Sequence, residues 1–184
     1  MSTHPIRRAF IRKKRSKKPL SATLWPGGGV DGFIKVVGRL AAQVPAGKAG
    51  ARRFILRAGE NFAFIRLQDM GNPLRFLKQM AGAPPYQFGA DGFRPDLVDD
   101  TNPARHYMAF VFLGFWLPRW LAVLGLWLWE VAGSVRYGYW ADKDITMGYL
   151  GIRHGRMVRQ MGPTVLPGLI AGELAVGYPK GTKL

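Results

Sequence analysis

The sequence predicts a mainly α-helical, membrane-associated protein, with a short helical hairpin and a third helix behind a basic N-terminal arm that is disordered or extended. Three observations predict this class. Basic residues are concentrated at the N-terminus, a proline interrupts a long apolar stretch over residues 104–133, and helix-start signals precede the apolar segments. The 184 residues suit one domain with appendages. We divide them into segments 1–24, 25–101, 102–162 and 163–184.

The arm carries most of the net charge of +16. Residues 1–60 hold 14 Lys or Arg and 2 Asp or Glu, which gives +12, whereas residues 61–184 hold 13 and 9, which gives +4. Such a run repels itself and favours an anionic surface, either lipid headgroups or nucleic acid, although a solvated tail has the same composition. Its basic residues are Arg7, Arg8, Arg12, Lys13, Lys14, Arg15, Lys17 and Lys18.

The residue types exclude several kinds of site. Disulfides, thiol chemistry and thiolate zinc sites are excluded because there is no cysteine, and three histidines make an all-histidine metal site unexpected. Phosphate-loop, HExxH, GxSxG and dinucleotide-binding motifs are absent from the sequence. No secretory signal peptide is expected, since no apolar run follows the basic start. We therefore predict neither a metal nor a cofactor.

The segment after the arm reads as short elements. Residues 25–32 form a turn-rich break, and residues 33–44 predict a short basic amphipathic helix suited to a membrane surface or a protein groove. Residues 45–53 are expected to be a linker. Residues 53–72 predict either a β-hairpin that turns at the letters AGEN or irregular chain.

Two more elements precede the apolar stretch. Residues 72–82 predict one short helix, with Asn72 at the N-cap and Pro73 at the first helical position. Residues 83–101 are rich in Pro, Gly and Asp and predict a loop.

The apolar stretch predicts two helices rather than one. Asn102 can cap a helix that begins at Pro103 and runs to residue 117. Pro118 lacks a backbone donor and clashes with the preceding turn, so it ends that helix and begins the next, over residues 118–133.

A third helix is predicted over residues 145–161, capped by Asp144. Its Gly148, Gly151 and Gly155 form a smooth stripe that allows another helix to approach closely. The remaining residues, 163–184, read as a Gly/Pro-rich tail.

Three arrangements of residues 104–133 stay open: a kinked span with Arg119 at its centre, a re-entrant hairpin bent at Pro118, and a buried pair of core helices. The tryptophans favour lipid, because Trp prefers the headgroup level. The lipid-facing or interface candidates are Trp116, Trp120, Trp127, Trp129 and Trp140. The basic arm is then expected on the cytoplasmic side.

The candidates for a catalytic site are His106, Glu130 and Asp144. Antiparallel packing of the two apolar helices brings His106 and Glu130 to one end, where Asp144 begins the third helix. Glu130 needs a partner in apolar surroundings, and we expect a cation, His106 first and then Arg105 or Arg136. A structural His–Glu pair with an Asp cap explains the same residues without chemistry, and His154 is expected at the surface.

The letters RHYMAFVFLG, WE and ADKDITMGYLGIRHG resemble the VanZ-like and YfiM-like membrane proteins. The positions that match are His106, Phe110, Gly114, Glu130, Asp144, Gly148 and Gly151, within residues 104–155. The resemblance implies a membrane protein of the cell envelope, without an established catalytic role. The chain departs from it in having one broken apolar region instead of several full spans, and in Thr146–Met147, near where the family usually shows Asn before Gly.

Three functions remain open from sequence. The first is a membrane-associated structural or anchoring protein of a larger assembly, with lipid and either a protein partner or a second copy as partners. The second is a virion or nucleic-acid-associated protein that binds through residues 1–20 and uses the apolar part as a subunit interface. The third is an envelope enzyme that uses His106 and Glu130.

Overall fold

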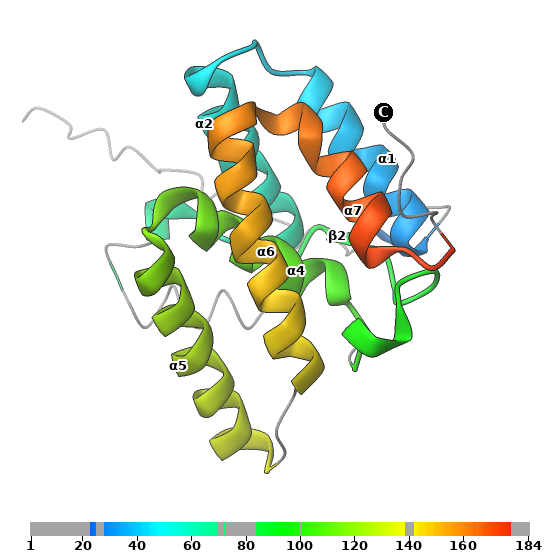
Figure 1. Ribbon diagram of the computed structural model, residues 1–184, viewed down its shortest axis with the longest axis vertical. Helices are drawn as coiled ribbons and strands as arrows, with labels where there is room; N and C mark the ends of the chain where they lie inside the picture. Colours follow the sequence, from blue (N-terminus) through cyan, green and yellow to red (C-terminus); the bar gives the residue numbers. More distant parts are fainter. Residues whose placement is uncertain are drawn as a thin grey trace, which may run out of the picture.

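The described chain is mainly helical, as the sequence predicts (Figure 1). The computed structural model describes residues 23–24, 28–69, 72, 84–99, 101–138 and 142–177. The α-helices in these ranges are α1 Gly29–Ala42, α2 Lys48–Ala58, α4 Pro103–Trp116, α5 Arg119–Tyr137, α6 Asp142–Met161 and α7 Leu166–Leu174. Two-residue strands, β1 Thr23–Leu24 and β2 Tyr86–Gln87, pair in parallel, with Thr23 opposite Tyr86.

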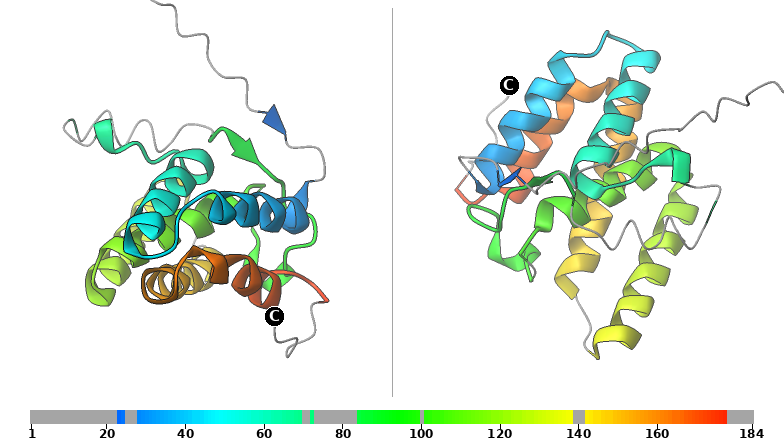
Figure 2. Two further views of the ribbon diagram at one scale, coloured as in Figure 1. Left: turned by 90° about the horizontal axis from the view of Figure 1, so that it is seen from above. Right: turned by 180° about the vertical axis from the view of Figure 1, so that it is seen from behind.

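One core joins helices from both halves of the chain. Helix α4 lies in the middle and makes its most extensive contact with α6, while α1 and α7 run side by side (Figures 1 and 2). Phe33 of α1, Phe54 of α2, Tyr107 of α4 and Leu166 of α7 are fully buried in the same cluster. The predicted apolar module over residues 102–162 is therefore continuous with the helices before and after it.

Helix α5 lies at the edge of the molecule, at the lower left of Figure 1. It packs through one face, where Ala122 and Leu126 contact Phe110 of α4 and Ile152 of α6. The predicted break is confirmed: α4 ends at Trp116 and α5 begins at Arg119, because Pro118 holds an extended backbone at the N-cap position.

Glycines set the close contact between α4 and α6. A Cβ atom added at Gly155 would lie 2.1 Å from the carbonyl oxygen of Val111, and one at Gly114 would lie 2.2 Å from that of Ile152. A Cβ at Gly148 would lie 2.5 Å from Cδ1 of the Leu126 side chain of α5. The predicted glycine stripe is confirmed, and it serves both neighbours of α6.

The turn predicted over residues 25–32 is wrong from Gly29 on, where α1 already begins, and residues 25–27 lie outside the described chain. Gly29 has a φ of +72°, and a Cβ there would lie 2.2 Å from the carbonyl oxygen of Asp91. Glycine thus lets the chain enter the helix against the loop before α4. The amphipathic helix is confirmed, but Phe33 and Val37 bury its apolar face in this chain's own core.

The linker predicted over residues 45–53 is wrong from Lys48 on. Over the described residues 53–69 the chain forms no hairpin, and it is irregular only over residues 64–66, so the prediction for 53–72 is mostly wrong. Helix α2 occupies residues 48–58, with Ala51, Phe54, Ile55 and Ala58 buried at helical spacing. A π-helical turn, η1, follows over Gly59–Ala63 and ends at Phe64, whose φ is 59°. Favourable burial on one helix face outweighs the β-propensity of this aromatic segment.

Two other predictions need correction. Helix α6 begins at Asp142, so Asp144 lies in the first turn and is not the N-cap. In the predicted tail, a 3₁₀ turn over Pro163–Val165 leads into α7, which buries Leu166, Ile170 and Leu174. The predicted loop is confirmed over residues 84–99, apart from β2 and one 3₁₀ turn. The helix predicted over 72–82 falls outside the described residues except for Asn72. The arm predicted over 1–24 also falls outside them, except for Thr23–Leu24, which form β1.

Candidate functional site

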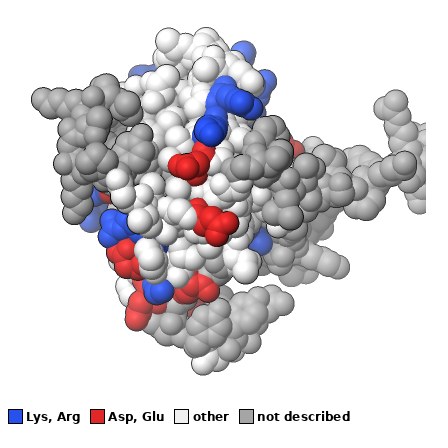
Figure 3. Space-filling view, turned by 90° about the vertical axis from the view of Figure 1, so that its right-hand side faces the viewer, with Lys and Arg blue, Asp and Glu red and all other residues white. Residues whose placement is uncertain are grey.

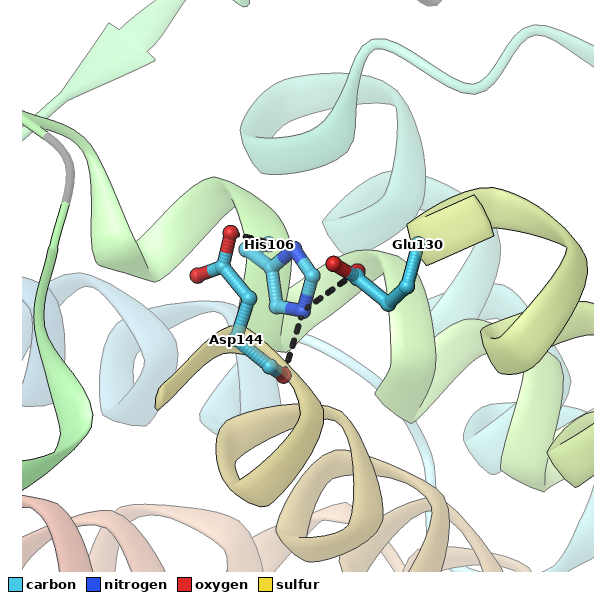
Figure 4. Close-up of side chains that lie close together, drawn as sticks. All are labelled: His106, Glu130 and Asp144. Carbon is cyan, nitrogen blue, oxygen red and sulfur yellow. Dashed lines mark hydrogen bonds and ion pairs between the residues drawn. The ribbon is translucent and has the colours of Figure 1, made fainter. Parts of the chain in front are cut away.

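His106, Glu130 and Asp144 come together, as the sequence predicts, at one end of α4, α5 and α6 (Figure 4). His106 lies in the first turn of α4 with 9% of its surface exposed. Its Nε2–H donates to the main-chain carbonyl oxygen of Asp144 at 2.8 Å. Because that oxygen can only accept, the bond fixes the proton on Nε2 and leaves the Nδ1 lone pair free in the neutral ring.

Carboxylates approach the ring from both sides (Figure 4). Glu130 Oε1 lies 3.8 Å from Nε2, and Asp144 Oδ2 lies 3.9 Å from Nδ1. Glu130 is only 6% exposed, and within the described part of the chain its Oε1 has no hydrogen-bond partner. Both distances are too long for hydrogen bonds. The three side chains therefore face one another, but neither carboxylate is hydrogen-bonded to the ring.

Burial shifts two of the three groups toward their neutral forms. Burial lowers the pKa of His106 to about 4, although the bond to Asp144 opposes the shift. Burial raises the pKa of Glu130 to about 7. The expectation that a cationic His106 holds Glu130 is therefore wrong, since the ring is uncharged at neutral pH. The side chain of Arg136, another predicted partner, lies outside what the structure describes.

An apolar groove of about 440 Å³ opens beside this cluster. His106, Arg105 and Asp144 form its polar end. Its apolar walls come from η1, α4 and α5 and from the chain beside them: Ala63, Ile65, Ala109, Phe110, Phe112, Leu113, Trp116, Leu117, Gly125 and Trp129. An apolar pocket with a few polar groups at one end is typical of a ligand site. The arrangement can accept or donate a proton, or supply one nitrogen and two oxygen ligands to a cation.

His154 was misplaced by sequence reasoning, which put it at the surface. It is fully buried, and its Nε2–H donates to Glu173 Oε1 of α7 at 3.2 Å. Its Nδ1 accepts from the Tyr107 hydroxyl of α4 at 2.7 Å. The signal was present, because His154 lies on the same helical stripe as Met147, Gly151 and Val158, which are all buried.

The prediction that the tryptophans face lipid or an interface stays untested. Trp116, Trp120, Trp127 and Trp129 are 39–67% exposed, and Trp140 lies outside the described residues. Between Trp120 and Val135 the one charged residue is Glu130, which faces inward. From Trp120 to Val135 the outer side of α5 therefore carries no charge.

A basic groove of about 600 Å³ adjoins this apolar side, between α5 and α6. Arg119, Arg153 and Arg156 line it together with Val123 and Tyr149. Trp127 Nε1–H donates to the Tyr149 hydroxyl at 3.1 Å and so connects the apolar side to the groove. The eight predicted anion-binding residues of the arm lie outside the described chain.

No described helix combines the length and the apolar character needed to cross a membrane. No protein-family model matches the chain, and no curated protein or solved structure is significantly similar to it. The resemblance to VanZ-like and YfiM-like proteins therefore stays a prediction.

Proposed function

We propose that the protein attaches to the surface of an anionic lipid membrane through the outer side of α5, as an anchoring component. The observation that carries the proposal is the uncharged, exposed side of this helix. Six side chains on it are 40–83% exposed: Trp120, Leu124, Trp127, Leu128, Val131 and Val135. A helix that is apolar on all sides is normally buried on all sides. Here the rest of the chain covers only one face of α5, and the opposite apolar face is exposed.

The surroundings of this face favour lipid as the covering partner. Tryptophans at the edge of an apolar surface prefer the headgroup level of a bilayer. Arg119 and Arg156 border the face and match anionic headgroups in charge, while Arg153 beside them is paired with Glu173. An interfacial helix that combines an apolar side with flanking basic residues binds anionic bilayers without spanning them.

The charge on the other side of the molecule is consistent with this orientation. Figure 3 views the side turned away from α5, where Asp and Glu side chains lie in the middle and lower part, with Lys and Arg above them and beside the lowest ones. The loop over residues 84–99 contributes the exposed Asp91, Asp96 and Asp99. These groups would be repelled by anionic headgroups, so this side would face water.

Vesicle co-sedimentation tests the proposal. We expect the full chain to sediment with vesicles that contain phosphatidylglycerol at about 0.5 M salt, where attraction through the basic arm is screened. Leu128→Glu should reduce this partitioning at least about tenfold, because it removes apolar area and adds a charge that anionic lipid repels. Met161→Glu is the matched control, since Leu128 and Met161 are both 63% exposed and Met161 lies off this face.

Equal vesicle binding by the Leu128→Glu and Met161→Glu variants would reject the proposal. So would a dimer that dissociates on Leu128→Glu while the wild type shows no partitioning, because a second copy would then cover α5. Analytical ultracentrifugation of the same three proteins separates these outcomes. Both substitutions are at exposed sites, so neither should prevent folding.

A further inference from the structure

We propose that His106, Glu130 and Asp144 bind one divalent transition-metal ion of the Zn²⁺ or Mn²⁺ type. One ring nitrogen and one oxygen from each carboxylate all lie within 4.8 Å of one another. Three atoms at that spacing lie within about 2.8 Å of a common point, so side-chain shifts of about 0.7 Å reach the usual metal–ligand distance of about 2.1 Å. The ion would connect α4, α5 and α6.

The buried carboxylate of Glu130 supplies the second observation. Its Oε1 faces the His106 ring at 3.8 Å and has no hydrogen-bond partner among the described residues. A carboxylate oxygen is costly to bury unless it is paired or coordinates a metal. Glu130 and Asp144 together carry two negative charges when ionised, and one divalent cation neutralises both.

His106 is already oriented as a metal ligand. Its Nε2–H donates to the carbonyl oxygen of Asp144 at 2.8 Å, which leaves the Nδ1 lone pair available on the side of Asp144 Oδ2. Metal-binding histidines commonly donate their other N–H to a carbonyl or carboxylate in this way. The Phe110 ring, 4.8 Å from the imidazole centroid, restricts its rotation.

The donor set indicates which ions suit the site. One imidazole and two carboxylates, without a thiolate, suit Zn²⁺ or Mn²⁺ better than copper(I) or iron–sulfur clusters. Three protein ligands leave at least one coordination position open. His106 and Asp144 line the apolar groove of about 440 Å³, so water or a small ligand can reach that position from it.

Isothermal titration of the full chain with ZnCl₂ and MnCl₂ tests the inference. We expect one ion per folded chain, and a loss of affinity of at least about tenfold in Asp144→Asn and in Glu130→Gln. Asp142→Asn is the matched control, since it removes an exposed carboxylate two residues away on the same helix. The ion should raise the melting temperature of the wild type and of Asp142→Asn but not of Asp144→Asn.

Pulsed electron paramagnetic resonance of the Mn²⁺-loaded wild type gives a readout that does not depend on the variants folding. One coordinated nitrogen is expected, and its loss in His106→Gln would assign it. The inference is overturned by the absence of one-to-one binding, by equal affinities in Asp144→Asn and the wild type, or by a manganese spectrum without nitrogen coupling. Equal losses in Asp142→Asn and Asp144→Asn would overturn it too, by locating the ion on the exposed acids of α6.

Discussion

His154 lies where α4, α6 and α7 meet, and its two ring nitrogens bond to Tyr107 and Glu173. Burial lowers the pKa of His154 to about 3, and the neighbouring charge of Arg153 lowers it further. Burial also raises the pKa of Tyr107 well above its ordinary value of 10. Both side chains are therefore neutral at physiological pH. The network between the helices joins the uncharged Tyr107 and His154 to the Glu173 carboxylate, which is paired with Arg153 at the exposed end.

The pKa of His154 predicts how stability depends on pH. The unfolded chain binds a proton on this ring below its ordinary pKa of about 6.5, whereas the folded chain does so only near 3. The free energy of unfolding should therefore fall as the pH drops through this window, by up to about 1.4 kcal/mol for each pH unit. In His154→Gln that contribution is absent, so the pH dependence should be shallower.

Urea unfolding of the wild type and His154→Gln between about pH 7 and pH 4 measures the two slopes. His106, whose pKa is about 4, adds a dependence of the same sign to both proteins, so the difference isolates His154. Identical slopes would show that His154 is not held neutral in the folded chain.

At the scale of elements, the contact between α4 and α6 depends on missing side chains. A Cβ atom added at Gly114, Gly151 or Gly155 would lie within 2.7 Å of an atom of the facing helix. The nearest atom is a backbone atom in each case, so it cannot rotate away as a side chain could. The contact brings Tyr107 against His154 and His106 against Asp144. Close packing of the two helices thus positions both polar clusters.

Gly155→Ala should destabilise the fold by about 1–3 kcal/mol, because its Cβ would lie 2.1 Å from the carbonyl oxygen of Val111. Gly172→Ala is the control: Gly172 is helical too, but nothing lies within 4 Å of its added Cβ. There alanine should stabilise by about 0.5–1 kcal/mol through its helix propensity. Thermal and urea unfolding measure both changes, and a stabilised Gly155→Ala would contradict the contact.

Sequence patterns located the helices of the second half because their signals are local. Pro103 begins α4, Pro118 breaks the chain and Gly162 ends α6, each through its own backbone geometry. The first half failed because Gly and Ala around residues 45–51 looked like a linker. Ala51 and Ala58 frame the larger Phe54 and Ile55 on one face of α2, and small residues carry little weight in an apolar pattern.

The candidate site was partly predictable, because the helix ends that carry it are marked by local sequence signals. The convergence of His106, Glu130 and Asp144 follows from antiparallel helices of known length. Their protonation was not predictable, because the pKa of Glu130 rises to about 7 only through burial that depends on the three-dimensional packing. His154 was misread because its neighbour Arg153 is exposed, although the helical period places the two side chains on different faces.

At the scale of the whole molecule, two kinds of attraction to an anionic surface are separated along the chain. Residues 1–20 hold eight Lys or Arg and no acid, which is half of the net charge of +16. The exposed side of α5 holds apolar residues instead, and Leu128 and Val135 are its most exposed aliphatic side chains. Charge attraction is screened by salt, whereas apolar burial is not, so salt distinguishes the two contributions.

We therefore predict two regimes of vesicle binding. At about 50 mM salt the wild type and Leu128→Glu should both bind anionic vesicles, because each basic residue near the surface contributes about 1 kcal/mol. At about 0.5 M salt the wild type should keep part of its binding and Leu128→Glu should lose it. A chain lacking residues 1–20 should show the converse, with weak salt dependence and retained binding at high salt.

Duplex DNA is the comparison surface, since it offers phosphates without an apolar layer and its binding should vanish with salt in every variant. Binding to DNA that persists at about 0.5 M salt, with vesicle binding that does not, would favour the nucleic-acid function over attachment to lipid.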